Sequence, residues 1–140
     1  MNGEVSEVDR ASLEPAVAEL LRAEPYGGSQ EAVRQLVHAD EALARTLGQR
    51  CFAKLVDGRV ASYCRLYSHG GVAQVEDVAT LPRWRGKGFA GAVVSRAVAE
   101  AAPTHGLTFL LAVDGRWVVQ WYARLGFEEV GLRYEFTQHR

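Results

Sequence analysis

The chain has little of what marks several classes of protein. Its two cysteines, Cys51 and Cys64, are too few for a disulfide framework and do not form a metal site. Both lie among alternating apolar residues, which predicts small buried side chains. No apolar run approaches the roughly 18 residues of a membrane span, and the N-terminus lacks the basic and apolar stretches of a signal peptide. We therefore expect a cytoplasmic protein with no metal and no membrane partner.

Charge of neither sign is in excess. The 140 residues include 16 basic and 17 acidic side chains, and the net charge is -1. A nucleic-acid binder usually carries a basic excess, so we expect no nucleic-acid partner. Lysine is scarce, since Lys54 and Lys87 are the only lysines, which we interpret as a compositional bias toward arginine. A chain of this length with 48% hydrophobic residues predicts one domain, residues 1–140, with a packed core.

The first half of the chain predicts helices followed by an antiparallel meander. A short strand over 5–8 precedes a helix capped by Ser12, and a second helix would begin at Ser29 and end at Gly48. From Arg50 onward, apolar residues alternate with a period of two. Strands are predicted over 51–56, 60–67 and 72–80, joined by turns at 57–58 and 68–71.

The second half predicts an alternation of helix and strand. Pro82 ends the last meander strand, and a glycine-bearing stretch leads into a helix whose apolar face runs from Phe89 to Ala101. A near-continuous apolar run over 107–113 predicts a strand buried on both faces. A short helix over 117–125, stopped by Gly126, and a final strand or hairpin over 127–137 complete the chain. The sum is an α+β fold with a central mixed, mostly antiparallel sheet flanked by helices on both faces.

The strongest chemical signal is the stretch TLPRWRGKGFAG, residues 80–91, where a strand ends and a helix begins. Free N–H groups at a helix N-terminus form an anion site, and glycines let the backbone approach a phosphate closely. Residues 86–91 also match the GxGxxG pattern of dinucleotide-binding folds, with Asp114 downstream. Against that interpretation, residues 81–85 separate the strand from the first glycine, and too few residues follow Asp114 to complete such a fold. The other alternative is a plain strand-to-helix turn with solvated cations.

The loop over residues 85–90 reads RGKGFA and resembles the acyl-CoA pyrophosphate loop, Q/RxxGxG/A, of the GNAT superfamily of N-acetyltransferases. Upstream, TLPRWR resembles that family's V-x-P-x-x-R run, with Thr80 in place of the usual apolar residue. Downstream, WYARLGF over 121–127 resembles its lYxxLGF ending. The resemblance covers residues 51–127 in order and spacing. Gly115 stands where the family often has an asparagine, so one of the family's CoA contacts is not expected here.

The resemblance implies direct transfer of an acetyl group from acetyl-CoA to an amine in a ternary complex. Tyr122 would be the general acid that protonates the leaving thiolate, and Glu76 the general base, with Asp77 or no base as the alternatives. We expect Glu76 and Asp77 on opposite sides of the sheet, because side chains alternate along a strand. Acetyl-CoA would bind along the main chain of the fourth strand and on the amides of the loop. The matching residues are Val78, Ala79 and Thr80 for the pantetheine arm, and Arg85, Gly86, Lys87, Gly88, Phe89 and Ala90 for the pyrophosphate.

The acceptor is expected to be a small-molecule or peptide amine, and a homodimer could form through exposed sheet edges. A second function remains open, that of a non-catalytic acyl-CoA binding or sensing module. Such a module would keep the loop and lose Tyr122 or the acidic strand. Both features are present in this sequence, which favours an enzyme.

Overall fold

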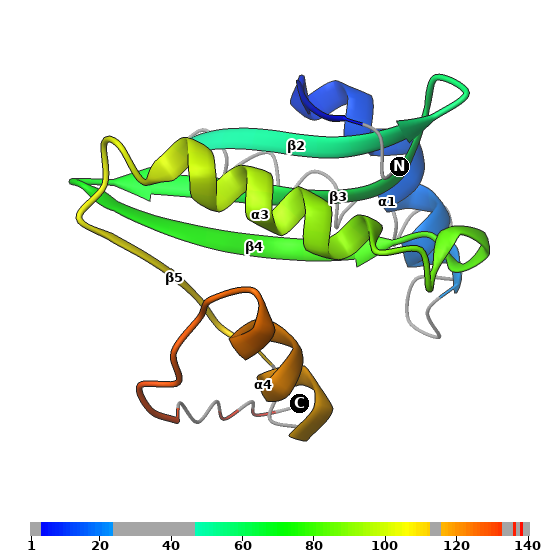
Figure 1. The fold of residues 1–140 in the computed structure, drawn as a ribbon. Coiled ribbons are helices and arrows are strands. Elements are labelled where there is room, and N and C mark those ends of the chain that lie inside the picture. Colours follow the sequence, from blue (N-terminus) through cyan, green and yellow to red (C-terminus); the bar gives the residue numbers. More distant parts are fainter. Residues whose placement is uncertain (1–3, 24–46, 113–115, 133–135, 137, 139–140) are drawn as a thin grey trace.

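The chain folds as one sheet with helices on its two faces (Figure 1). The computed structural model describes residues 4–23, 47–112, 116–132, 136 and 138. The elements follow in the order β1 (Val5–Val8), α1 (Arg10–Ala23), β2 (Gly48–Val56), β3 (Arg59–His69), β4 (Val72–Thr80), a 3-10 turn (Pro82–Trp84), α3 (Phe89–Ala101), β5 (Leu107–Leu110) and α4 (Arg116–Arg124).

The strands lie in the order β1-β2-β3-β4-β5. The first four are antiparallel to their neighbours, and β5 is parallel to β4. The β2–β3 hairpin turns at Asp57 and Gly58, whose φ values of 51° and 76° match the positive φ that a two-residue hairpin loop requires. This confirms the mixed, mostly antiparallel sheet and the meander that the alternation predicts.

Two hydrophobic cores lie on opposite faces of the sheet. The helix α3 covers one face and α1 the other, as Figure 1 shows with α3 in front of the strands. Because side chains alternate along β2, Phe52 packs toward α3 and its neighbour Cys51 toward α1. The α3 side holds Phe52, Cys64, Leu66, Val75, Val93, Val94 and Ala97, and the α1 side holds Leu13, Ala16, Cys51, Ala53, Tyr63 and Leu81. The prediction of helices on both faces and of buried cysteines is confirmed.

Several element boundaries differ from those predicted for the first half of the chain. The helix α1 begins at Arg10, and the N–H of Ser12 donates to the carbonyl of Asp9 at 3.0 Å. Ser12 therefore lies inside the first turn, and Asp9, also a favoured cap residue, precedes the helix. Gly48 begins β2. The helix predicted from Ser29 lies outside the described residues.

The end of the chain departs further from prediction. The strand β5 is short, and Leu107 and Leu111 are 56% and 45% exposed, so the prediction of a strand buried on both faces is wrong. The reason is that α1 and α3 pack over β1–β4, while β5 lies beyond them at the end of the described strand order. The helix α4 agrees with prediction to within one residue at each end. Residues 127–132 form no strand, contrary to prediction, and Val130 is 96% exposed, without the burial that a paired strand provides.

Candidate active site

The strand β4 contains a bulge at its centre. Glu76 lies opposite Arg65 on β3, and the next pair is Ala79 with Tyr63, so the two residues 77–78 face the single residue 64. Asp77 has a φ of 54°, in the left-handed region. An extra residue of this kind bends its strand and shifts the alternation of side chains beyond it.

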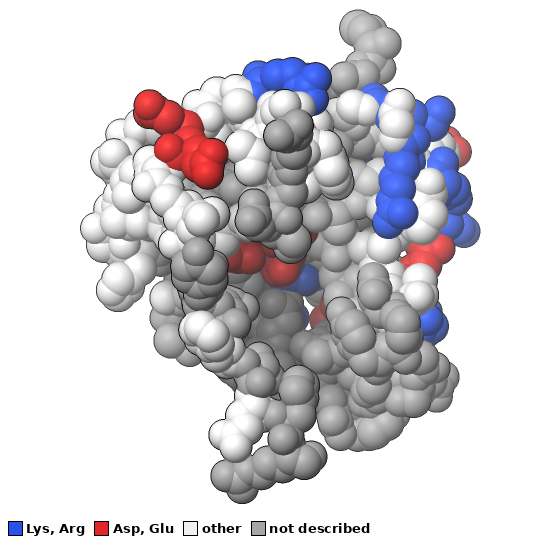
Figure 2. Space-filling model, turned by 90° about the horizontal axis from the view of Figure 1, so that it is seen from below, with Lys and Arg blue, Asp and Glu red and all other residues white. Residues whose placement is uncertain are grey.

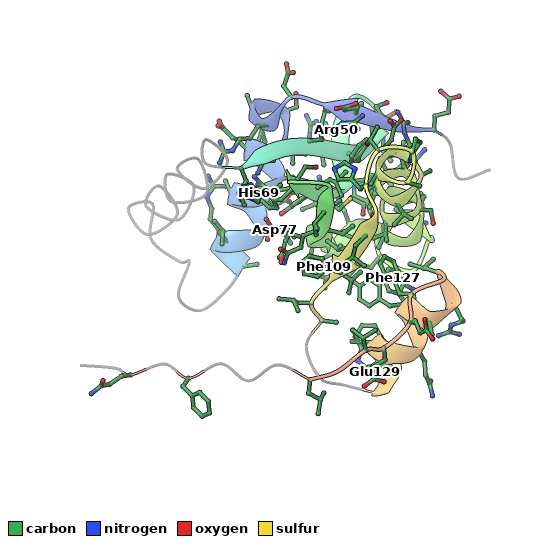
Figure 3. The ribbon with its side chains drawn as sticks, turned by 90° about the vertical axis from the view of Figure 1, so that its left-hand side faces the viewer. Arg50, His69, Asp77, Phe109, Phe127 and Glu129 are labelled. Atoms are coloured by element: carbon green, nitrogen blue, oxygen red, sulfur yellow. The ribbon has the colours of Figure 1, made fainter. Side chains whose placement is uncertain are left out.

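The bulge places Glu76 and Asp77 on the same face of the sheet. The carboxylate of Asp77 lies 3.3 Å from Nε of Arg65, and Arg65 is the cross-strand neighbour of Glu76. Figure 3 shows Asp77 on the α1 side of the sheet, away from α3. The expectation that these two carboxylates face opposite sides is therefore wrong, because that expectation assumed a regular strand.

The outer edge of β4 separates from β5 where the bulge begins. The two strands pair only from Val72 with Leu107 to Val75 with Leu110, while β4 continues to Thr80. Among the described strands, none therefore lies beside residues 76–80 on that side. The hydroxyl of Ser62 donates to the carbonyl of Ala79 at 2.9 Å, and Nε of Arg85 donates to the carbonyl of Thr80 at 3.1 Å. The predicted pantetheine-binding residues, Val78, Ala79 and Thr80, thus lie in an extended strand whose outer edge has no described strand beside it.

The glycine loop ends at an uncapped helix N-terminus. After the 3-10 turn, Gly86 and Gly88 have φ values of 77° and 81°, and Gly88 is the N-cap of α3 with no side chain to cap the helix. The first N–H groups of a helix lack partners within the helix, and the helix dipole is positive there. The amides of Phe89 and Ala90 therefore lie at an end of α3 that favours an anion. Binding of an anion by the loop residues stays a prediction.

The charges around this helix end come from the loop and from a distant strand. Arg83, although next to the loop, forms an ion pair with Glu19 on α1 at 2.8 Å. Lys54 comes instead from β2, and its Nζ lies 5.5 Å from the centre of the Phe89 ring. Figure 2 shows basic side chains gathered at the edge of the molecule where β4 leads into α3. Within the described part of the chain, no carboxylate forms an ion pair with Lys54, Arg85 or Lys87.

Lys54 is a candidate residue that the sequence analysis missed. One signal was available, because Lys54 alternates with Phe52 on β2 and so points to the same face of the sheet. That signal cannot show which end of α3 lies above the lysine. Both lysines of the chain therefore lie near the start of α3, Lys87 in the loop and Lys54 against Phe89.

Tyr122 lies on α4 in a cluster of aromatic side chains. Its ring contacts those of Trp121 and Phe127 edge-on, with centroid distances of 4.8 and 5.8 Å. Gly126, with a φ of 97°, turns the chain so that the N–H of Phe127 donates to the carbonyl of Tyr122 at 3.1 Å. This turn explains why a glycine precedes Phe127 in the WYARLGF motif.

The helix α4 packs against the start of α3. A Cβ on Gly91 would lie 3.6 Å from Cδ2 of Leu125 and 3.9 Å from Trp121, which are van der Waals distances, so α4 lies close against α3 at this position. Burial raises the pKa of Tyr122, and electrostatic interactions with the ionisable groups of Cys64 and Glu76 raise it further. The phenol is therefore protonated at neutral pH, and Glu76 lies near enough to affect its ionisation.

Figure 2 shows acidic and basic side chains close together near the centre of the face that it presents. Nε2 of Gln74 donates to Oε1 of Glu76 on the same face of β4.

Among the described residues, no cluster of three or more His, Cys, Asp or Glu side chains could hold a metal ion. No described helix is long and apolar enough to cross a membrane.

The sequence model of the acetyltransferase (GNAT) family matches residues 14–127 of the chain. The chain belongs to the GNAT family. This confirms the family that the sequence motifs indicated, and membership supports an acyltransferase that uses acetyl-CoA as donor. No curated protein matches the chain in sequence.

Solved structures share the GNAT fold with this chain. An acetyltransferase from Trypanosoma brucei has a TM-score of 0.70 at 19% identity, with 96% of this chain and 99% of that chain covered. AAC(6')-Iy in complex with the bisubstrate analog CoA-S-monomethyl-acetylneamine has a TM-score of 0.68 at 17% identity, with 98% and 97% covered. Glucosamine-6-phosphate N-acetyltransferase from Arabidopsis thaliana has a TM-score of 0.67 at 13% identity, with 96% and 97% covered. At these identities the likeness supports the fold class and leaves the residue roles as predictions.

Proposed function

We propose that this GNAT protein transfers an acetyl group from acetyl-CoA directly to an amine nitrogen in a ternary complex. One observation carries the proposal. Beyond residue 75 the edge of β4 has no described strand beside it, α3 begins without a side-chain cap, and Tyr122 lies near enough to Glu76 of β4 for that carboxylate to affect its pKa. An acyl donor that lies along this edge can have its phosphates at the helix end and its thioester near the phenol.

The donor would be held mainly by the main chain. The amides of residues 85–90 would bind the pyrophosphate, and the edge of β4 at residues 78–80 would bind the pantetheine arm. Lys54 joins Arg85 and Lys87 as a third cation near the helix end. An anion at this place gains from both the helix dipole and the nearby positive charges.

In the proposed reaction Tyr122 and Glu76 move the two protons. Glu76 takes a proton from the attacking amine, directly or through water, as the C–N bond forms. Tyr122 donates its proton to the sulfur as the C–S bond breaks, so the products are the N-acetyl amine and the CoA thiol. Both groups then exchange protons with solvent to return to their starting states. Positioning the amine beside the thioester supplies a further large part of the rate.

The state of the cysteines supports direct transfer over an acetyl-cysteine intermediate. Burial raises the pKa of Cys64 to about 12, and its thiol donates to the carbonyl of Val93 at 3.4 Å. A nucleophilic cysteine must be a thiolate, and Cys64 is protonated at neutral pH. Nitrogen as the acceptor atom is supported by the fold shared with glucosamine-6-phosphate N-acetyltransferase. A cytoplasmic location, a homodimer and the absence of nucleic-acid and membrane partners stay predictions.

The proposal is tested by two measurements on the purified chain. In a thermal shift assay acetyl-CoA should raise the melting temperature, and NAD should not. At a concentration of acetyl-CoA a hundredfold above its Kd, the folded state should gain about 2.7 kcal/mol of stability. With a panel of small-molecule and peptide amines, acetyl-CoA should release free thiol in the presence of at least one amine. Stabilisation by NAD alone contradicts the proposal. Stabilisation by acetyl-CoA without thiol release for any amine would indicate the binding or sensing module instead.

A further inference from the structure

Arg65 is a charged residue in the interior of the sheet. Its side chain is 4% exposed, and only Ser62 and Arg65 are buried polar or charged residues among those that the structure describes. A guanidinium stays protonated in any protein environment, so it cannot lose its charge to suit a buried position. A charge at such a place is costly unless carboxylates or other acceptors face it.

The bulge in β4 brings a carboxylate to this charge. Asp77 is the residue with left-handed φ, and its Oδ2 lies 3.3 Å from Nε of Arg65. In a regular strand, Asp77 would point to the face opposite that of Glu76, toward α3. That face holds the apolar core around Cys64, Val75 and Val93. Loss of the bulge would therefore move one charge into an apolar core and take it away from the other.

We propose that Arg65 is a positioning residue whose ion pair with Asp77 holds the β4 bulge, and with it the exposed edge of β4 that binds the acyl donor. The ion pair stabilises the register of β4 against β3. A one-residue slip would move the side chains of the strand to the opposite face, which is unfavourable wherever one face is apolar and the other charged. Asp77 is then part of this structural pair, and Glu76 is the carboxylate that accepts the proton. The inference rests on the proposed function for the identity of the donor.

The proposed ion pair predicts how the Kd for acetyl-CoA should rank among three variants. Asp77→Asn tolerates the left-handed backbone and removes the charge that faces Arg65, so the Kd for acetyl-CoA, measured by calorimetry, should rise about tenfold. Arg65→Met leaves Asp77, which is 47% exposed and can be solvated, so the rise should be smaller. The double variant Arg65→Met/Asp77→Asn removes both charges and should bind acetyl-CoA more tightly than Asp77→Asn alone.

The chain offers a matched control. Asp57 is the other described non-glycine residue with positive φ, at 51°, and it lies in the exposed β2–β3 turn. Asp57→Asn should leave the Kd for acetyl-CoA within twofold of the wild-type value. A general effect of replacing an aspartate in this backbone conformation would instead appear in both variants.

The pH profile of kcat distinguishes the positioning role from a proton-accepting one. If Glu76 accepts the proton, Asp77→Asn should keep the acidic limb of the profile at the wild-type pH, while the KM for acetyl-CoA rises. Loss of that limb in Asp77→Asn would overturn the assignment, as would a Kd within twofold of the wild-type value or strictly additive effects in the double variant.

If the wild-type protein transfers no acetyl group, the proposed function fails, and the Kd values still test the ion pair. If Asp77→Asn does not fold, the double variant should fold and Arg65→Met should bind with a raised Kd; failure of either result overturns the proposal.

Discussion

Gly86 and Gly58 form a matched pair that tests the phosphate site directly. Their φ values are 77° and 76°, and a Cβ at either position would have no heavy atom within 4 Å. Gly86 lies in the loop before α3, whereas Gly58 lies in the β2–β3 turn, outside the predicted donor-binding residues. Substitution by alanine is therefore the same local perturbation at both places, with no clash at either one.

The cost of both substitutions can be worked from the backbone alone. A residue with a Cβ in the left-handed region costs about 1–2 kcal/mol. Both alanine variants should lose this much stability, which lowers Tm by about 4 °C per kcal/mol for a chain of this size. For Gly86→Ala the same strain also opposes the loop conformation that presents its amides to the pyrophosphate, and the new methyl group lies beside that ligand. We expect the Kd for acetyl-CoA to rise about tenfold, equivalent to about 1.4 kcal/mol.

The assay is calorimetric titration of both variants with acetyl-CoA, beside thermal unfolding without ligand. The expected result is a similar loss of Tm in both variants and a weaker Kd only for Gly86→Ala. If both variants keep the wild-type Kd within twofold, the pyrophosphate does not bind on the backbone at Gly86. If both weaken binding equally, the effect comes from lost stability, and the reasoning from loop geometry is refuted in that case too.

Three further predictions concern the acid, the added cation and the charge network around β1. Tyr122→Phe should lower kcat at least about tenfold, within the range of general-acid contributions, with the Kd for acetyl-CoA nearly unchanged; an unchanged kcat removes the acid role. Lys54→Met should raise the Kd for acetyl-CoA severalfold and reduce its dependence on salt, while Lys54→Arg should keep the wild-type values; an effect equal at low and high salt would contradict an electrostatic role. Hydrogen bonds from Arg50 lower the pKa of Glu7 and of Glu100 below 4.5, so the stability they contribute is present above that pH and lost as the pH falls through their folded pKa. In urea unfolding, Arg50→Met should lose less stability between pH 6 and 3 than the wild-type chain, and parallel losses would contradict this.

Much of the fold could be predicted because alternation and turn chemistry are local signals. The bounds of β4 agree with prediction, and Asp57 with Gly58 turns the hairpin as those residue types indicate. The segment 107–113 fails for a reason that is not local. An apolar run shows that a strand can be buried, but burial on both faces needs a packed layer over each face, and α1 and α3 pack over β1–β4.

The candidate site also combines features that contiguous motifs predict with features that depend on tertiary packing. The loop and the WYARLGF segment are contiguous motifs, and the structure places their residues at the start of α3 and on the helix α4 that packs against it. Lys54 and Arg83 show what such motifs cannot provide. Arg83 is adjacent to the loop in sequence but pairs with Glu19, and Lys54 reaches Phe89 from a distant strand. These contacts of Arg83 with α1 and of Lys54 with α3 arise only from packing, so the sequence could not predict them.

The bulge at Asp77 could not be predicted from the sequence, and it changes which face of the sheet the candidate proton acceptors share. The local sequence does not distinguish a regular strand from a bulge at Asp77. The residues around it, VEDVAT, are compatible with either conformation. What selects the bulge lies on the neighbouring strand, where the buried Arg65 draws a carboxylate to its own face. With a regular strand, two carboxylates on opposite faces would be rival candidates for the proton acceptor. With the bulge, both lie on one face, Asp77 forms an ion pair with Arg65 there, and the same extra residue begins the segment where β4 and β5 separate. The assignment of Glu76 and the opening of the donor site therefore depend on the same structural event, so variants of Arg65 should affect the Kd for acetyl-CoA although Arg65 itself is buried beneath the strand edge.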